Sequence, residues 1–292
     1  MKLVKREIPW TDPITHEPLI IDNALISSKS SSYSIIDGIP NFIENISDEI
    51  QKQVQESFGE KWTKTTFANN DSEFEKKLKP IYLEMMGLKE TDLDIFNNKT
   101  ILEVGIGSGS SSRLWCKQSK EFHGVDISKA VYAVSDNLKN FYQHSILSQA
   151  DINHLPYDDE SFDVIVSNGV FHHTPNTKES LKNSLKKLKV GGFCIFYIYK
   201  IKSPIREFSD DYIRSKISHL PYDEAYEKIK TLTNFGKSLS KKNSDIIIPS
   251  DIDFLGIKKG TYNLQRFFYD YFFKCFWNED WGYDYSNLVN ID

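Results

Sequence analysis

The sequence predicts an α/β fold built on a doubly wound, mainly parallel, Rossmann-like sheet. Short apolar runs alternate with amphipathic helical patterns between residues 99 and 200, which is typical of strands joined by crossover helices. A glycine-rich turn at residues 105–109 follows the first run directly, and the second run closes on the carboxylate of Asp126. Strands are expected at 99–104, 121–125, 145–150, 162–168 and 191–199, with helices at 110–119, 128–139 and 177–188.

Four regions are expected along the chain. Residues 1–47 resemble a small β module with short strands and turns, and 48–98 form a helical lead-in with helices at 48–67 and 73–86. Residues 99–200 form the core. Residues 201–292 form a helical insertion after the fifth strand, followed by an aromatic C-terminal segment.

The last region has three expected features. Helical structure is expected over 203–243, with Ser203-Pro204 at its start, because proline is accepted in the first turn of a helix. The segment 267–277 is apolar nearly all round if helical, so it should be buried against the sheet or against a dimer partner. Docking on a membrane surface is disfavoured by the lack of a basic face. The strand-like run at 288–292 suggests a shortened chain.

Charge and cysteine content restrict the class of partner. The 292 residues carry 36 basic and 41 acidic side chains, a net charge of −5, so no DNA partner is expected, although RNA stays open. Three widely spaced cysteines form neither a disulfide framework nor a zinc site, which favours a cytoplasmic protein. No signal peptide and no membrane-spanning run is evident.

The glycine turn and the acids that follow the strands favour a nucleoside cofactor. The turn has the spacing G-x-G-x-G, whereas a nicotinamide dinucleotide site would have G-x-G-x-x-G. Asp126 can accept hydrogen bonds from ribose hydroxyls at the end of the second strand. Asp151 follows the third strand, where it can accept from the exocyclic amine of adenine, with Ile152 beside the ring.

This ordered set, over about residues 99–200, resembles the class I S-adenosylmethionine-dependent methyltransferases, especially the type 11 branch. The resemblance implies S-adenosyl-L-methionine as cofactor and S-adenosyl-L-homocysteine as product. It also implies that the lead-in helix folds over the cofactor, with Trp62 near the methionine end, although plain helix packing would equally explain Trp62. The cofactor residues implied are Glu103, Gly105, Gly107 and Gly109 around the methionine, Asp126 at the ribose, Ile127, Asp151 and Ile152 at the adenine, and Asn168 and Gly169 near the sulfonium.

Catalysis by such an enzyme needs alignment and, for a hydroxyl or protonated amine acceptor, a base. His172 and His173 follow the fourth strand and are the candidate bases, while local packing is the alternative. We expect methyl transfer to an oxygen or nitrogen of a small molecule, such as a sugar or a secondary-metabolite intermediate. Arg206, Arg214 and Lys216 could meet an acidic substrate group, but a solvated helix face is the preferred interpretation.

Residues 10–43 resemble a zinc-ribbon-like module of the tRNA-methyltransferase activator type. Metal-binding versions carry cysteines at the places of Asp12 and Thr15, so thiolate ligation of zinc is lost here. We therefore expect a metal-free structural module. This similarity does not imply action on RNA.

Three rival functions stay open at this point. One is a non-catalytic methyltransferase-like scaffold or partner subunit, which could also dimerise through the aromatic segment. Another is an RNA or protein methyltransferase. The third, a nicotinamide oxidoreductase, is opposed by the glycine spacing, and arsenic methylation is disfavoured because clustered cysteines are absent.

Overall fold

The chain forms two compact units, residues 1–199 and 200–291, in the computed structural model. The structure describes residues 6–22, 25–43, 49–64, 72, 74–139, 142 and 145–275. The predicted strand-like run at 288–292 and the end of the aromatic segment lie outside these residues. Each unit is described by itself below.

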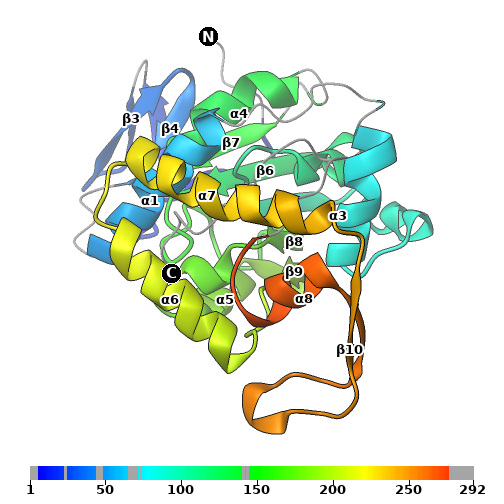
Figure 1. Ribbon diagram of the computed structural model, residues 1–292. Coiled ribbons are helices and arrows are strands. Elements are labelled where there is room, and N and C mark those ends of the chain that lie inside the picture. The colour runs from blue at the N-terminus through cyan, green and yellow to red at the C-terminus, as the bar shows by residue number, and fades with distance from the viewer. Residues whose placement is uncertain are drawn as a thin grey trace. The chain divides into compact units, whose positions relative to one another are not determined.

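The first unit contains a nine-stranded sheet in the order β1-β2-β3-β4-β7-β6-β5-β8-β9 (Figure 1). The strands from β7 to β9 in this order are all parallel, which confirms the predicted doubly wound α/β fold. Their bounds are β5 Thr100–Val104, β6 Glu121–Asp126, β7 Ile146–Gln149, β8 Phe162–Asn168 and β9 Leu188–Tyr197.

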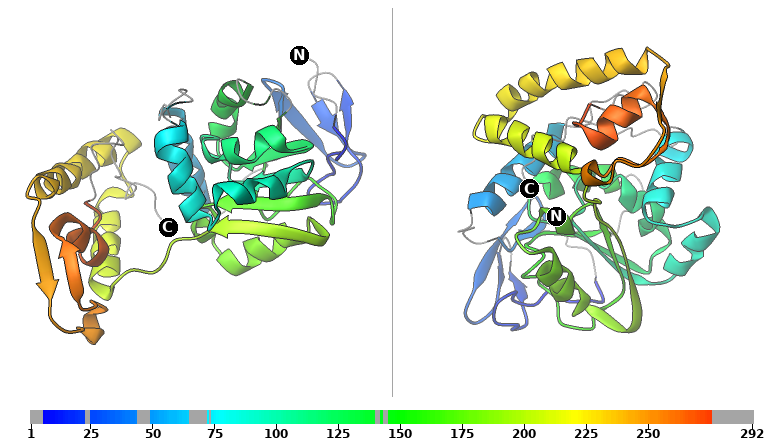
Figure 2. Two further views of the ribbon diagram at one scale, coloured as in Figure 1. Left: turned by 90° about the vertical axis from the view of Figure 1, so that its right-hand side faces the viewer. Right: turned by 60° about the horizontal axis from the view of Figure 1, so that its bottom comes forward.

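The N-terminal strands continue this sheet (Figures 1 and 2). Strand β4 pairs in parallel with β7 at Asn41 and Gln149, and the Phe42 amide donates to the Gln149 carbonyl at 2.8 Å. Successive N-terminal strands pair with one another in antiparallel fashion. Their bounds are β1 Ile20–Asp22, β2 Leu25–Ser27, β3 Ser32–Ile36 and β4 Ile39–Asn41.

Both faces of the parallel sheet are buried at strands β5 to β8, whereas β9 is only partly buried. Adjacent residues of β5 enter different cores: Leu102 joins a cluster with Trp10 and Phe42 of the N-terminal module, whereas Ile101 joins a cluster with Trp115 and Val134. Continuous apolar strands are therefore required, as expected for a parallel sheet covered on two sides. The covering helices are α1 Glu49–Lys64, α3 Lys79–Met85, α4 Ala130–Lys139 and α5 Thr177–Leu185.

The segment after the glycine turn differs from the prediction. In place of one helix over 110–119, the chain makes two 3₁₀ turns, Ser111–Leu114 and Cys116–Gln118. Successive serines at 110–112 have low helix propensity because their hydroxyls compete for backbone hydrogen bonds. Trp115 breaks the helical path with φ −126°, and its indole N–H reaches the Glu103 carboxylate at 2.9 Å.

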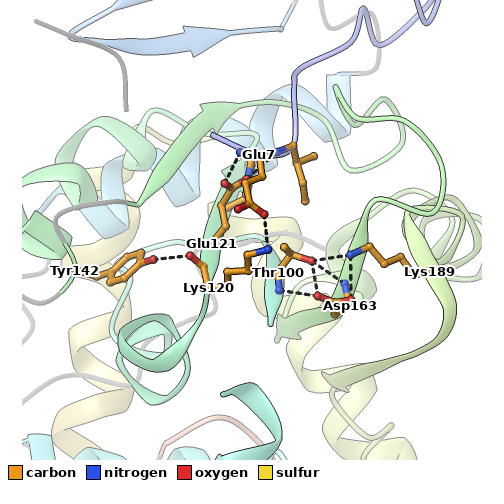
Figure 3. A network of polar contacts seen from close by, with 9 residues as sticks. Glu7, Thr100, Lys120, Glu121, Tyr142, Asp163 and Lys189 are labelled. Carbon is orange, nitrogen blue, oxygen red and sulfur yellow. Dashed lines mark hydrogen bonds and ion pairs between the residues drawn. The ribbon is translucent and has the colours of Figure 1, made fainter. Parts of the chain in front are cut away.

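A polar network lies at the edge where the parallel strands begin (Figure 3). The Asp163 carboxylate accepts hydrogen bonds from the Thr100 amide and hydroxyl, at 2.8 and 2.7 Å, and pairs with Lys189 at 3.0 Å. The Glu121 carboxylate accepts from the backbone amides of Glu7 and Ile8, which attaches the N-terminal segment to β6.

The second unit is a helical hairpin with a two-stranded sheet and a short final helix. The predicted helical region over 203–243 starts as expected, with Ser203 accepting from the Arg206 amide, but Pro221 divides it into two helices. The bounds are α6 Pro204–Ile217, α7 Tyr222–Ser240, β10 Asp245–Ile248, β11 Gly260–Asn263 and α8 Leu264–Tyr271.

One expectation about this unit needs correction. Arg206 does not lie on a solvated helix face: it is 3% exposed, pairs with Asp210 at 2.7 Å and donates to the Tyr269 carbonyl. The aromatic segment makes contacts within its own unit, since the Phe268 ring lies 6.0 Å from Phe235 of α7. Its predicted burial against the sheet or a dimer partner stays a prediction. No helix of the described chain is long and apolar enough to cross a bilayer.

Candidate functional site

The glycine turn follows β5 and is held by β6. The amides of Gly105 and Ile106 both donate to the Val125 carbonyl, at 2.8 and 3.0 Å. Gly105 has φ +73°, and a Cβ added there would lie 2.2 Å from the Val170 side chain. Gly107 has φ +52°. Any larger residue at these two positions would be strained, so the turn keeps its backbone open to a ligand.

Asp126 is the last residue of β6 and is 7% exposed. One carboxylate oxygen accepts from the Gly107 amide at 2.8 Å, and the other from the Ser128 amide and hydroxyl at 2.8 and 2.7 Å. Burial raises the pKa of Asp126 in spite of these bonds. A carboxylate offers about four acceptor positions, so one remains for a further donor.

Glu103 lies one residue before the end of β5, fully buried beneath the turn. It accepts from the Trp115 indole at 2.9 Å and from the Ser111 hydroxyl at 3.3 Å. Burial raises the pKa of its carboxyl to about 7. The carboxyl therefore holds the segment after the turn, and its predicted place around a methionine group stays a prediction.

The end of β7 supplies a second carboxylate. One oxygen of Asp151 accepts from the Asn153 amide at 2.9 Å, and the other from the Gln51 side-chain amide at 3.0 Å. Ile127, just after β6, is half-buried, and its carbonyl accepts from Gln55 at 2.8 Å. Ile152 is buried within the apolar cluster beneath the sheet surface. Asp126, Ile127 and Asp151 thus meet at one edge of the sheet, as predicted for consecutive strand ends.

Helix α1 lies across these strand ends. A Cβ on Gly107 would meet the Trp62 indole nitrogen at 3.2 Å, and a Cβ on Gly59 would meet the Ser128 Cβ at 3.7 Å. Trp62 therefore lies against the glycine turn, and its place near the methionine end of a cofactor stays a prediction. Gln51 and Gln55 were not predicted as site residues; their spacing of four from each other and from Gly59 is the signal that could have revealed a shared helix face.

The end of β8 carries an aromatic cluster. Asn168 closes the strand, and Gly169, at φ +73°, begins the turn that leads to the two histidines. The His172 ring lies 4.0 Å from His173 and 4.1 Å from Tyr199 between centroids. Phe58 of α1 contacts His173 at 4.8 Å. Tyr199, which follows β9, is a site neighbour that the sequence did not indicate.

The N-terminal module has a hydrogen-bond hub at Asp12, one of the two positions where metal-binding versions would carry cysteines. The buried Asp12 carboxylate accepts from the amides of Ile14 and Thr15, at 2.9 and 2.8 Å, and from the Tyr33 hydroxyl at 3.1 Å. Burial opposes the charged form, but these bonds outweigh it and lower the pKa of Asp12 to about 2. Within the described residues, no group of three or more His, Cys, Asp or Glu side chains could hold a metal ion. The zinc-ribbon resemblance stays a prediction.

Comparison with known proteins gives matches to a methyltransferase family and to individual methyltransferases. Residues 102–196 match the methyltransferase domain family. The ubiquinone biosynthesis O-methyltransferase of Coxiella burnetii (strain Dugway 5J108-111) is 32% identical over 123 residues, 41% of this chain and 53% of that protein. Phthiotriol/phenolphthiotriol dimycocerosates methyltransferase 1 of Mycobacterium ulcerans is 25% identical over 130 residues, 44% of this chain and 48% of that protein. The chain thus spans about half the length of these relatives.

Among solved structures, the N-methyltransferase NodS from Bradyrhizobium japonicum WM9, in complex with S-adenosyl-L-homocysteine, aligns with a TM-score of 0.40 and 19% identity. The alignment covers 53% of this chain and 75% of NodS. The candidate residues from Glu103 to His173 all lie within the residues that match the methyltransferase domain family.

Proposed function

We propose that the chain is an enzyme that transfers the methyl group of S-adenosylmethionine to an oxygen or nitrogen of a small-molecule acceptor. One observation carries the proposal: the glycine turn and the carboxylates of Asp126 and Asp151 meet at adjacent strand ends beneath one helix. That is the place where an open parallel sheet binds nucleotides.

The chemistry of these residues fits the cofactor. Ribose hydroxyls and the adenine amine are donors, and Asp126 and Asp151 each keep acceptor positions beyond the bonds they make. The Trp62 indole packs directly against the backbone of Gly107, since a Cβ there would lie 3.2 Å from the indole nitrogen. An aromatic face is a favourable neighbour for a sulfonium cation.

When bound, the cofactor supplies an electrophilic methyl group on a positively charged sulfur. The contribution of the chain is to bind, orient and exclude water. Asp126 would hold the ribose, and Ile127 and Asp151 the adenine, while Trp62 and the glycine turn enclose the methionine end together with Asn168 and Gly169. Helix α1 would shield this groove from solvent.

An acceptor hydroxyl must also lose its proton. His172 and His173 follow the fourth parallel strand, and we assign one of them to receive that proton on a ring nitrogen. The Tyr199 ring packs against His172 in a tilted arrangement, with 4.1 Å between centroids and 38° between the rings, so it would restrict the orientation of the imidazole. His172→Gln should lower kcat at least 100-fold with little change in cofactor affinity, and His173→Gln is the matched comparison. Equal kcat in wild type and both variants would remove the base from the mechanism.

The acceptor class is supported by the names of the relatives, one of which serves ubiquinone biosynthesis and another phthiotriol dimycocerosates. These names favour small molecules over RNA or protein. A non-catalytic scaffold remains the rival, because the chain spans only part of those relatives. Methylation assays with phenolic, sugar and amine acceptors, alongside RNA, would decide among the substrate classes.

Calorimetric titration with S-adenosylhomocysteine tests the cofactor site. Asp126→Ala should abolish measurable binding because the ribose acceptor is lost, whereas Asp158→Ala, an exposed carboxylate outside the crevice, should bind like wild type. Circular dichroism would show that the variants are folded. A folded wild-type protein that binds neither S-adenosylmethionine nor S-adenosylhomocysteine would overturn the proposal and leave the scaffold.

A further inference from the structure

A continuous row of aromatic rings runs from the glycine turn to the end of β9. Its first member, Trp62, lies against the turn and is stacked on Phe58, with 6.5 Å between the ring centroids. The Phe58 ring lies 4.8 Å from His173. His172 follows at 4.0 Å from His173, and Tyr199 completes the row at 4.1 Å from His172. These five rings, called the aromatic row below, come from α1, from the turn after β8 and from the residue two positions after β9.

The aromatic row is partly open to solvent, whereas the ring beside it is not. Tyr199 is 46% exposed, and the other four members are half-buried. Phe171, which directly precedes His172, is fully buried in an apolar core cluster. Phe171 therefore belongs to the core, while the row presents its rings at the surface beside the strand ends. Partly exposed aromatic rings gathered in one place are typical of a ligand-binding surface.

Tyr199 lies beside the turn that follows β8. A Cβ on Gly169 would lie 3.8 Å from both Cε1 and the hydroxyl oxygen of Tyr199. The same ring contacts both candidate bases, at 4.1 Å for His172 and 5.8 Å for His173 between centroids. Under the proposed function, Gly169 lies near the sulfonium and one histidine receives the acceptor proton. Tyr199 thus adjoins both the position of the methyl group and the base.

The histidines favour one kind of acceptor for this surface. A phenolic hydroxyl has a pKa of about 10, as in tyrosine, so an imidazole can take up its proton in the course of the transfer. An aliphatic hydroxyl holds its proton far more tightly, so the same base would assist it less. A phenol also has a flat ring, which packs favourably on other aromatic rings. Both properties match what the aromatic row offers.

We propose that the methyl acceptor is a phenol whose ring packs on the aromatic row, and that Tyr199 is the specificity-determining residue that holds this ring. The proposal rests on the proposed function. In the transfer, the phenolic oxygen forms a bond to the methyl carbon, and the carbon–sulfur bond breaks with its electron pair going to sulfur. The hydroxyl proton passes to a ring nitrogen of His172 or His173. Tyr199 sets where the phenol lies, and the histidine takes the proton.

Binding of catechol to the protein saturated with S-adenosylhomocysteine tests the ring contact without turnover. Calorimetry measures the affinity. An aromatic pair contributes a factor of about three to ten, so Tyr199→Leu should weaken catechol binding by that factor. Tyr199→Phe keeps the ring and should stay within twofold of wild type. Phe196→Leu is the matched control, because it removes an exposed ring of β9 that packs on Phe171, and it should bind catechol like wild type.

Steady-state methylation tests the class of acceptor. Catechol and cyclohexane-1,2-diol both carry two neighbouring hydroxyls on a six-membered ring, but only catechol is aromatic and acidic. We expect kcat/KM for catechol to exceed that for the diol by about 100-fold or more. Tyr199→Leu should raise KM for catechol about three- to tenfold and leave kcat within twofold, because the ring holds the acceptor rather than moving its proton. Tyr199→Phe should restore the wild-type KM.

The outcomes separate this inference from the proposed function. Methylation of the diol as fast as catechol would overturn the phenol class, and an unchanged KM and affinity in Tyr199→Leu would overturn the assignment of Tyr199. Wild-type protein that binds S-adenosylhomocysteine, but neither binds nor methylates catechol, 4-methylphenol or 1-naphthol, would overturn the inference alone. A folded wild-type protein that binds no S-adenosylhomocysteine would instead overturn the proposed function.

Discussion

The two edges of the parallel sheet treat their carboxylates in opposite ways. Where the strands begin, Glu121 accepts from the amides of Glu7 and Ile8, and Asp163 accepts from Thr100 and pairs with Lys189 (Figure 3). Burial opposes the charged form of both carboxyls, but the hydrogen bonds outweigh it and lower the pKa of each. Where the strands end, burial raises the pKa of Glu103 and Asp126. No cation pairs with either among the described ion pairs.

This difference separates structural acids from candidate binding acids. A carboxylate with satisfied partners contributes to stability, whereas a buried one kept without a counter-ion is destabilising and calls for another explanation. In this chain the buried carboxylates without a counter-ion, Glu103 and Asp126, lie at the same sheet edge as the glycine turn and Asp151. The comparison therefore supports binding at the strand ends and attachment at the strand starts.

The strand-start edge also contains a buried histidine whose state can be assigned. Burial lowers the pKa of His123, so it is neutral at pH 7 and donates from Nε2 to Glu121 at 2.7 Å. Burial raises the pKa of Tyr157 to about 12, so its hydroxyl stays protonated and donates to His123 Nδ1 at 3.2 Å. The chain from Tyr157 to the Glu7 and Ile8 amides is thus fully paired and carries one negative charge.

The largest expected effect comes from breaking this chain. Glu121→Ala should lower the free energy of unfolding by about 3 kcal/mol, because two backbone amides and His123 lose their buried acceptor. Urea unfolding at pH 7 measures the change. Affinity for S-adenosylhomocysteine should stay within twofold of wild type; a large loss of affinity with normal stability would contradict the division between the two edges.

At the opposite edge, Glu103→Gln should remove the loss of unfolding free energy that the wild-type protein shows as the pH rises. The folded pKa of Glu103, about 7, lies above its ordinary value of 4.5, so its stabilising contribution is complete below pH 4.5 and is lost as the pH rises through 7. Relative to wild type, the variant should gain about 3 kcal/mol in unfolding free energy between pH 4.5 and pH 8. Urea titrations at these two pH values test this, and a difference that does not change with pH would show that folding leaves the pKa of Glu103 unshifted.

For Asp12, the contribution to stability should change with pH in the opposite direction, and over a lower pH range. Its folded pKa of about 2 lies below its ordinary value of 3.8, so its stabilising contribution is present above pH 3.8 and is lost as the pH falls through 2. Asp12→Asn should cost about 2 kcal/mol at pH 6, and the cost should shrink steadily toward pH 2. Thermal unfolding at several pH values measures the gap. A constant gap would assign the effect to packing of the hub rather than to its charge.

The smallest effect should come from the exposed part of the strand-start edge. Lys120 pairs with Glu7 at 2.7 Å, but both side chains are about half exposed, so solvent screens their attraction. Lys120→Ala should leave the midpoint of urea unfolding unchanged within error. A clear decrease would mean that the N-terminal segment is held to β6 by charge as well as by the Glu121 hydrogen bonds.

Local patterns were enough to predict the core strands. Strand 162–168 has the predicted bounds, and the others end within two or three residues of them. The prediction of a helix at 110–119 was wrong. The hydrogen bond from Trp115 to Glu103 competes with that helix, and it depends on a residue of strand β5 outside the segment. The region predicted to be helical over 203–243 forms two helices, α6 and α7, with Pro221 between them, a break that the sequence itself contains.

The sequence by itself determined the alternation of strands and helices, the glycine turn and the acids at consecutive strand ends, because these depend on short-range periodicity and backbone freedom. Only the tertiary structure decided which groups those acids face. The pairing of Asp151 with Gln51, the hydrogen bond from Arg206 to the Tyr269 carbonyl and the continuation of the sheet from β7 into β4 each join residues far apart in the chain. Such contacts depend on how elements pack, and no local pattern of residue types encodes that packing.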